Sequence, residues 1–323
     1  MSEDGLIARY FAPLAGPGAD GMRDDAATLT PSPGCDLVLT ADAIVAGVHY
    51  FPDDPPASIA RKALGVNLSD LAAKGAAPRG FLLTLALPDD WTEGWLAAFT
   101  AGLADASAAA GCPLLGGDTV RSGGPALIGV TAFGEVPTGG MVRRTTARIG
   151  DRLCVSGTVG DGALGLLLRR DPAWASALDG GMRAHLADRY LHPRPRLPLA
   201  PLLRRHASAA MDVSDGFAGD LAKMLGDGRG ALVEAGAVPL SPAAAAALRA
   251  EPGLVVPVLT GGDDYEVLCA VPPGALDAFL AECAGAGLAM TAVGTVVAGD
   301  RVPAFAMADG THRRFAAGAF SHF

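Results

Sequence analysis

Aspartate residues stand repeatedly beside apolar runs in this sequence. Asp42 follows the run Leu37-Val-Leu-Thr-Ala, and Asp118 follows Leu114-Leu-Gly-Gly, although charged residues make up only 18% of the chain. Asp70 lies inside an otherwise apolar helical stretch, where an unpaired acid is costly. Further aspartates are placed in similar ways: Asp24-Asp25, Asp212, Asp215 and Asp263-Asp264. One such residue alone is typical of a turn or a helix N-cap, but so many of them indicate a common site.

Carboxylates that gather in one place repel one another, and a multivalent cation makes such a cluster favourable. The sequence has no His and Cys spacing typical of zinc, and its six histidines form no HxxxH pair. Ligation by oxygen alone favours a hard ion such as Mg²⁺. Because Mg²⁺ held by several carboxylates usually serves a polyphosphate substrate, we predict several Mg²⁺ ions and a substrate of that class.

Two glycine pairs precede these aspartates and favour contact with phosphate. Gly116-Gly117 and Gly261-Gly262 have no Cβ atoms, so their backbone N–H groups can approach phosphate oxygens closely. Ser214 can either donate its hydroxyl group to a phosphate or cap the helix that follows it. Arg143-Arg144 fit a charge clamp on phosphates, with a solvated surface pair as the alternative.

The common nucleotide-binding motifs are absent or incomplete. No GxxxxGK[ST] loop and no protein-kinase motif set occurs. The stretch Gly160-Asp-Gly162-Ala-Leu-Gly165 matches GxGxxG, but a dinucleotide site also needs a second strand that ends in an acid about 20 residues later. The sequence after Arg170 has no apolar strand pattern. We therefore predict that these glycines shape a tight turn between a strand and a helix.

Length and composition limit the remaining possibilities. The 323 residues include 25 Lys and Arg against 34 Asp and Glu, a net charge of −9, and 50% are hydrophobic, which favours two globular domains. The sequence has no basic cluster for nucleic acid and no apolar run long enough to span a membrane. The acidic start Met1-Ser-Glu-Asp4 is unlike a secretory signal, and the five cysteines are scattered, so we predict a cytoplasmic protein with reduced thiols.

Hydrophobic periodicity predicts alternating helices and strands, and therefore an α/β or α+β fold. The segment 137–150, rich in Gly, Arg and Thr, suggests a boundary between domains 1–140 and 141–323. The predicted helices are 56–73, 92–110, 162–170, one that begins at Met182, 199–206, 219–225 and 241–250. The predicted strands are 37–40, 80–87, 113–115, 126–134, 152–156, 255–259, 266–270 and 292–297.

Taken in order, the motifs resemble those of the thiamine-monophosphate kinases, over residues 6–323. They are Leu6-Ile-Ala-Arg-Tyr-Phe11, Asp24-Asp25-Ala26, Thr40-Ala-Asp42, Val45-Ala-Gly-Val-His49-Tyr50-Phe51, Asn67-Leu-Ser-Asp70-Leu-Ala-Ala, Gly116-Gly-Asp118-Thr119, Asp212-Val-Ser-Asp215-Gly216, Gly261-Gly-Asp-Asp264-Tyr-Glu266 and Phe320-Ser-His-Phe323. The resemblance implies phosphorylation of thiamine phosphate by ATP to thiamine diphosphate. It also implies the two-domain fold of aminoimidazole ribonucleotide synthetase, in which two N-terminal domains pair into a β-barrel that spans a homodimer.

The resemblance further assigns roles to individual residues. It implies that the N-terminal domain binds ATP and Mg²⁺ and forms the dimer, and that the C-terminal domain is an α/β unit. The implied Mg²⁺ ligands are Asp25, Thr40, Asp42, Asp70, Asp118, Asp212 and Asp215. The implied ATP contacts are Gly117, Asp118, Arg144 and Ser214. The implied contacts to thiamine phosphate are His49, Asp263 and Phe320.

Three positions depart from the family pattern. Arg23 stands where the family often has glycine, and Ala41 stands where it has a hydroxyl residue between Thr40 and Asp42. Both changes lie in the implied metal-binding motifs, where Arg23 can neutralise part of the acidic charge. Asp263 is one methylene shorter than the glutamate that the family commonly has at this position.

The expected mechanism needs no catalytic base. The acceptor of this reaction is a phosphate oxygen that is already ionised at neutral pH, and the sequence has no Ser-His-Asp order. We therefore expect direct in-line transfer that depends on positioning and charge neutralisation. The alternatives are another ATP-dependent enzyme of the same superfamily, such as a selenophosphate synthetase, and an inactive nucleotide-binding homologue. The absence of cysteine from residues 1–34 disfavours the selenide-using enzyme, and the terminal Phe323 disfavours the hydrogenase-maturation enzyme, which ends in a reactive cysteine.

Overall fold

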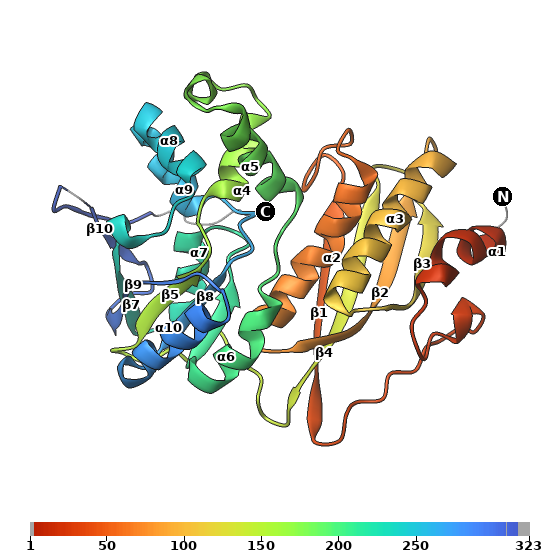
Figure 1. Ribbon diagram of the computed structural model, residues 1–323, viewed down its shortest axis with the longest axis horizontal. Helices are drawn as coiled ribbons and strands as arrows, with labels where there is room; N and C mark the ends of the chain where they lie inside the picture. The colour runs from red at the N-terminus through yellow and green to blue at the C-terminus, as the bar shows by residue number, and fades with distance from the viewer. Residues whose placement is uncertain (1–2, 308, 316–323) are drawn as a thin grey trace. The chain divides into compact units, whose positions relative to one another are not determined.

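The computed structural model describes residues 3–307 and 309–315 (Figure 1). The chain divides into two compact units. Unit 1 comprises Met1–Leu71 and Ala76–Met141, and unit 2 comprises Ala72–Gly75 and Val142–Phe323. The short segment Ala72–Gly75 thus belongs to unit 2, although the chain on both sides of it belongs to unit 1.

Unit 1 is built on a four-stranded sheet with two long helices on one face (Figure 1). The strand order is β1-β4-β2-β3, antiparallel except for the parallel pair β2 and β3. The strands are β1 (Cys35–Val45), β2 (Ala77–Leu87), β3 (Leu114–Arg121) and β4 (Leu127–Pro137), and the helices are α2 (Pro56–Ala73) and α3 (Glu93–Ala110). The N-terminal segment adds α1 (Glu3–Leu6) and a π-helical turn (Ile7–Phe11).

The core of unit 1 lies between the helices and one face of the sheet. Leu64 of α2 and Phe99 of α3 pack with Phe81 and Val130 of the sheet, all buried. Alternate residues of the strands point to the other face, where Leu39 is 61% exposed. Within the described residues the sheet is open, so the barrel expected from the resemblance is not closed by this chain alone.

Unit 2 has a seven-stranded sheet in the order β11-β10-β7-β9-β5-β8-β6. The strands are β5 (Arg152–Ser156), β6 (Ala209–Asp212), β7 (Arg229–Glu234), β8 (Val267–Val271), β9 (Met290–Ala298), β10 (Ala304–Ala306) and β11 (His312–Arg313). The helices are α4 (Asp161–Leu168), α5 (Gly180–Leu191), α6 (Ala200–His206), α7 (Phe217–Leu225), α8 (Pro242–Ala250), α9 (Val255–Thr260) and α10 (Leu276–Gly285).

Strand β8 is buried on both faces, as its continuous apolar sequence requires. Leu268 packs with α7 on one face, and Cys269 packs with α6 and α10 on the other. Both neighbours of β8, the strands β5 and β6, run antiparallel to it. The residues that follow β5 and β6 therefore lie at the same edge of the sheet as the residues that precede β8. This edge brings together Ser156, Asp212 and the segment 261–266.

One predicted strand is wrong. Val255–Leu259 is part of the helix α9, not a strand. A short apolar run does not distinguish a buried helix from a buried strand, and Pro257, in the first turn, has no N–H to give to a β ladder. The short strand β6, the strand β7 and the helix α10 were not among the predicted elements. Among the described residues, no helix is long and apolar enough to cross a lipid bilayer.

Candidate functional site

A pocket of about 720 Å³ lies within unit 1, on the face of the sheet that α2 and α3 leave open. Asp25 of the N-terminal segment and Asp118 of β3 line it, and both are exposed. Its apolar wall includes Phe11, Leu39 and Phe133. The structure therefore places two of the predicted metal ligands beside an apolar surface.

Gly117 lines the same pocket and is required by the sheet. A Cβ atom at this position would lie 1.9 Å from the carbonyl oxygen of Leu83 on the neighbouring strand β2. The absent side chain therefore lets β2 and β3 approach, and it leaves the backbone of Gly117 beside Asp118 at the pocket. A Cβ atom at Gly116, in contrast, would be in ordinary contact with Leu82.

A second group of predicted residues is held together by β1 and α2. The Thr40 hydroxyl group donates a hydrogen bond to Asp70 Oδ2 at 2.5 Å. The backbone N–H of Asp42 donates to Asn67 Oδ1 at 3.0 Å, which ties β1 to α2. Asn67 belongs to the motif Asn67-Leu-Ser-Asp70, but the family resemblance gives it no role. The helical spacing of Asn67 and Asp70, three residues apart, was the available signal.

The predicted magnesium site is not assembled as one cluster in the described part of the chain. No group of three or more His, Cys, Asp or Glu side chains there is close enough to hold a metal ion. Asp25 and Asp118 line the same pocket, while Asp70 accepts a hydrogen bond from Thr40. The seven-residue metal-ligand set therefore stays a prediction.

His49 is positioned by the backbone of its own turn. The N–H of Val45 donates to His49 Nδ1 at 3.0 Å. A ring nitrogen that accepts a hydrogen bond carries no proton, so this contact selects the neutral tautomer with its proton on Nε2. The imidazole can therefore donate a hydrogen bond from Nε2.

In unit 2, Asp212 ends β6, and Asp215 lies in the turn before α7. The ammonium group of Lys223 contacts Asp215 Oδ2 and donates to Asp220 Oδ1 at 2.9 Å. Burial alone would lower the pKa of Lys223, but its hydrogen bonds to both carboxylates raise it above the usual value. Asp215 thus already has a cationic neighbour, which the sequence analysis missed. The spacing of Asp220 and Lys223 on one helix could have revealed half of this contact.

Ser214 does not cap α7. Gly216 precedes this helix and no side-chain hydrogen bond caps it in the described structure. The N–H of Asp215 is satisfied by Asp220 Oδ2 at 2.9 Å. The helix-cap role of Ser214 is therefore wrong, and its contact with phosphate stays a prediction.

Ser214 is joined directly to Asp263 through the backbone. The N–H of Asp263 donates to the Ser214 carbonyl at 2.9 Å, and that of Tyr265 donates to Val213 at 2.8 Å. A Cβ atom at Gly262 would lie 2.3 Å from the Ser214 carbonyl oxygen. The absent side chain of Gly262 therefore makes room for this loop contact.

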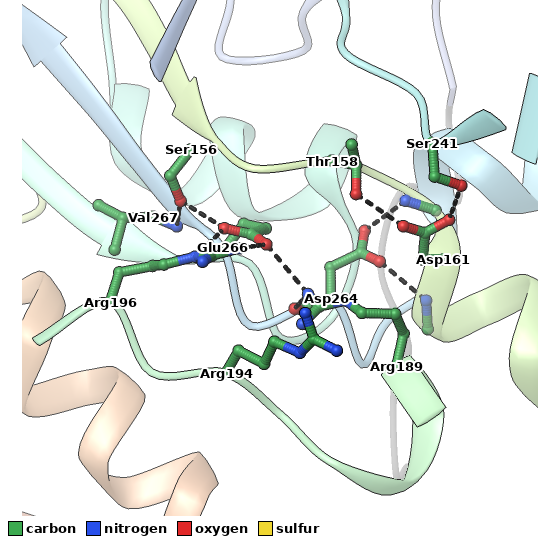
Figure 2. Close-up of polar contacts among 12 residues, drawn as sticks. Ser156, Thr158, Asp161, Arg189, Arg194, Arg196, Ser241, Asp264, Glu266 and Val267 are labelled. Carbon is green, nitrogen blue, oxygen red and sulfur yellow. Dashed lines mark hydrogen bonds and ion pairs between the residues drawn. The ribbon is translucent and has the colours of Figure 1, made fainter. Parts of the chain in front are cut away.

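Three carboxylates behind these loops are fully buried, and each has its own set of donors (Figure 2). Asp264 accepts the backbone N–H groups of Gly160 at 2.7 Å and Gly162 at 3.0 Å. Glu266 accepts from Arg189 at 3.0 Å and from Nε of Arg196 at 2.7 Å. The third set places Asp161 within hydrogen-bond distance of Ser241, Thr158 and His185.

These contacts explain the glycine motif at residues 160–165. In a dinucleotide site, the N–H groups at the start of the helix would face a pyrophosphate. Here the N–H groups of Gly160 and Gly162 donate hydrogen bonds to the Asp264 side chain instead. The motif therefore binds a carboxyl group of the protein itself, and its glycines shape the turn from β5 into α4.

The structure does not place two other predicted site residues, Arg144 and Phe320, at the site. Arg144 is exposed in the segment that follows unit 1, next to Arg143, whose carbonyl accepts the N–H of Ala210. Phe320 lies outside the described residues.

Comparison with known proteins gives the relationship of the chain. Residues 23–136 match the N-terminal domain of AIR synthase related proteins, and residues 148–305 match the C-terminal domain. The thiamine-monophosphate kinase of Caulobacter vibrioides is 42% identical over 305 residues, which are 93% of this chain and 85% of that protein. The enzyme of Escherichia coli K12 is 38% identical over 304 residues, 92% and 90% of the two chains. This chain belongs to the thiamine-monophosphate kinase family.

Solved structures agree with this assignment. A thiamine-monophosphate kinase from Stenotrophomonas maltophilia K279a superposes with a TM-score of 0.77 at 38% identity, covering 86% of this chain and 88% of that one. A structure described as AaThiL complexed with AMPPCP and TMP gives a TM-score of 0.79 at 27% identity, covering 99% and 94%. The hydrogenase maturation protein HypE in complex with ATP shares the fold, with a TM-score of 0.80 at 21% identity over 97% of this chain and 94% of that one.

The buried Asp264 predicts a dependence of stability on pH. Burial, together with the charges of Asp161 and Glu266, raises the pKa of Asp264 to about 8, although its two backbone hydrogen bonds act in the opposite direction. In the unfolded chain the pKa of an aspartate is about 3.9. Between these values the folded state binds one more proton than the unfolded state. The free energy of unfolding should therefore fall as pH rises, by at most about 1.4 kcal/mol per pH unit from this group.

We expect Asp264→Asn, which cannot titrate, to lose this part of the pH dependence. Urea unfolding of the native protein and of the variant at about pH 5.5 and about pH 7.5 measures it. The change in unfolding free energy between the two pH values should be larger for the native protein. Equal changes in the two proteins would contradict the assignment.

Proposed function

We propose that this protein transfers the γ-phosphoryl group of ATP to thiamine phosphate, giving thiamine diphosphate and ADP. The relationship to the thiamine-monophosphate kinases carries this proposal, since the identity reaches 42% over nearly the whole chain. The related structure with AMPPCP and TMP supports an ATP-like donor and thiamine monophosphate as the acceptor. The backbone contact between Ser214 and Asp263 agrees with this proposal, because it joins a proposed donor contact to a proposed acceptor contact.

For ATP we propose contacts to Gly117, Asp118, Arg144 and Ser214. The pocket beside Gly117 and Asp118, at about 720 Å³, is within the usual range for small-molecule sites. Its apolar wall suits a nucleobase, and its aspartates suit metal-bound phosphates. Arg144 is exposed and has a guanidinium group that can neutralise phosphate charge.

For thiamine phosphate we propose His49, Asp263 and Phe320. The thiazolium ring carries a positive charge, which favours a carboxylate and an aromatic face. Asp263 supplies the carboxylate, and His49 offers a neutral ring with an N–H donor at Nε2. Phe320 completes the set as an aromatic residue near the C-terminus.

For Mg²⁺ we propose Asp25, Thr40, Asp42, Asp70, Asp118, Asp212 and Asp215. The donor set consists of oxygen atoms, which fit a hard divalent ion. The hydrogen bond from Thr40 to Asp70 joins two of these proposed ligands and orients the Asp70 carboxylate. Lys223 covers one oxygen of Asp215, so this residue offers the metal its other oxygen. Bound Mg²⁺ would neutralise the charge of the phosphates.

Proton transfer by a side chain has no place in this mechanism. The acceptor phosphate has a second pKa of about 6 and is therefore mainly dianionic at neutral pH. His49 already uses the lone pair of Nδ1 to accept the Val45 N–H, and its other nitrogen carries the proton. The protein residues thus bind, align and neutralise two anions, and the transfer proceeds directly from donor to acceptor.

We also propose a homodimer in which the open faces of two unit 1 sheets form one barrel. Val120 of β3 is 45% exposed on this sheet and does not line the pocket. A face with such residues gains free energy when a second copy covers it. Cytoplasmic location stays a prediction from the sequence.

The activity itself is the first test. Purified protein with ATP, Mg²⁺ and thiamine phosphate should form thiamine diphosphate, detected by chromatography. Thiamine should give no product, because its hydroxyl group needs a base that the proposed site does not offer. A folded protein that binds ATP but forms no thiamine diphosphate would be an inactive homologue, and the proposal would fail.

Substitution of a proposed metal ligand is the second test. Asp118→Asn should lower kcat by at least about 100-fold while the protein stays folded, because a neutral amide binds Mg²⁺ weakly. Asp105→Asn is the matched control, since it makes the same change at an exposed position of α3 that contacts Arg61. Native kcat in Asp118→Asn, measured at saturating ATP and Mg²⁺, would remove the metal-binding role.

The oligomeric state is the third test. Light scattering after gel filtration should give twice the chain mass of 32.5 kDa. Val120→Glu should give the monomer mass, because it places a charge on the proposed contact face at a position that does not line the pocket. Val256→Glu, at a position in unit 2 that is 41% exposed, should stay dimeric. A native protein of monomer mass would contradict the barrel.

A further inference from the structure

We infer that Asp264 and Gly162 are positioning residues that hold Asp263 in the orientation needed to bind thiamine phosphate. This inference rests on the proposed function, which gives Asp263 its role at the substrate. It adds the physical reason why a side chain beside a flexible Gly-Gly pair has a fixed direction. All the contacts involved lie within unit 2.

The backbone around Asp263 adopts a conformation that needs outside support. Asp263 has φ = 71° and Tyr265 has φ = 51°, both in the left-handed region that side chains other than glycine rarely occupy. Two such residues, separated by one position, persist only where the surrounding structure determines them. The support must therefore come from contacts of the segment 261–266.

Asp264, between the two strained residues, supplies the first support (Figure 2). Its side chain is fully buried, and its two carboxylate oxygens accept the N–H groups of Gly160 and Gly162. Its own carbonyl accepts a hydrogen bond from Arg189 Nη2 at 2.9 Å, and the same nitrogen also donates to Glu266 at 3.0 Å. Side chain and backbone of Asp264 are thus both fixed, which leaves Asp263 little freedom to rotate.

Gly162 supplies the second support through close packing. A Cβ atom there would lie 2.3 Å from the carbonyl oxygen of Asp263 and 2.4 Å from its carbonyl carbon. The first turn of α4 therefore rests directly on the Asp263 backbone. Any side chain at position 162 must push Asp263 away, although it removes no charge and no hydrogen-bonding group.

The displacement would reach the nucleotide contact as well. Asp263 donates its N–H to the Ser214 carbonyl at 2.9 Å, so the two proposed substrate contacts move as one. Transfer between two bound molecules depends steeply on their alignment, and an error of about 1 Å can lower the rate about 100-fold. A defect at Gly162 or Asp264 should therefore change both KM for thiamine phosphate and kcat.

The test compares two glycine variants of unit 2, one in α4 and one in β9. Gly162→Ala should raise KM for thiamine phosphate and lower kcat, with a combined loss in kcat/KM of about 10- to 100-fold. Gly294→Ala is the matched control, because its Cβ atom would lie 2.3 Å from the carbonyl oxygen of Leu232 on β7, away from the loop and from Arg189. It should lower the unfolding temperature as Gly162→Ala does and leave both kinetic constants within about twofold, as expected away from the reacting groups.

A second pair makes the test independent of the folding of Gly162→Ala. Asp264→Asn removes one of the two acceptors that fix the loop, and Asp161→Asn removes an equally buried carboxylate that contacts Ser241, Thr158 and His185 instead. Only Asp264→Asn should raise KM for thiamine phosphate. If the loop variants and their controls have the same kinetic constants, this inference fails while the proposed function stands. Failure of the native protein to form thiamine diphosphate would overturn the proposed function together with it.

Discussion

A carboxylate that leaves water needs donors or cations for its oxygens, and this requirement orders the functional parts of both units. In unit 2 the protein satisfies its buried carboxylates internally: Asp264 by backbone N–H groups, and Glu266 by two arginines. In unit 1 Asp25 and Asp118 face an open pocket instead. The first kind of carboxylate fixes loops in place, and the second is available to a ligand that brings its own positive charge.

The sequence predicted the presence of these acids but could not separate the two kinds. Asp118 and Asp264 both follow a Gly-Gly pair, yet one faces a pocket and the other is buried beneath a helix start. The difference depends on contacts more than 100 residues apart in the chain, such as Gly160 with Asp264. The same limit applies to Asp215, whose neighbour Lys223 becomes visible only when α7 is in place. Local spacing identifies the residue type that a site needs. Long-range packing decides whether that side chain is buried or faces a pocket.

The helices and strands also differ in how well the sequence predicts them. The helix 56–73 and the strand 152–156 were predicted with their observed bounds, because each has a clear period and clear ends. The run 255–259 was misassigned, since five apolar residues fit a helix and a strand equally well. Strand β6 is only four residues long, yet it ends at Asp212 and sets the edge at which Ser214 meets Asp263. The most informative element for the site was thus among the least visible in the sequence.

The glycines of unit 2 connect these observations to the proposed chemistry. Gly-Gly pairs and GxGxxG motifs are commonly interpreted as phosphate-binding backbone. Here the absent Cβ atoms of Gly162 and Gly262 make room for Asp263 and Ser214, and those of Gly160 for Val258. These glycines let three loops pack backbone against backbone, so that a few side chains keep fixed directions. When both substrates are anions and no proton has to be moved, such fixed placement is the main contribution that the protein itself can make to the rate.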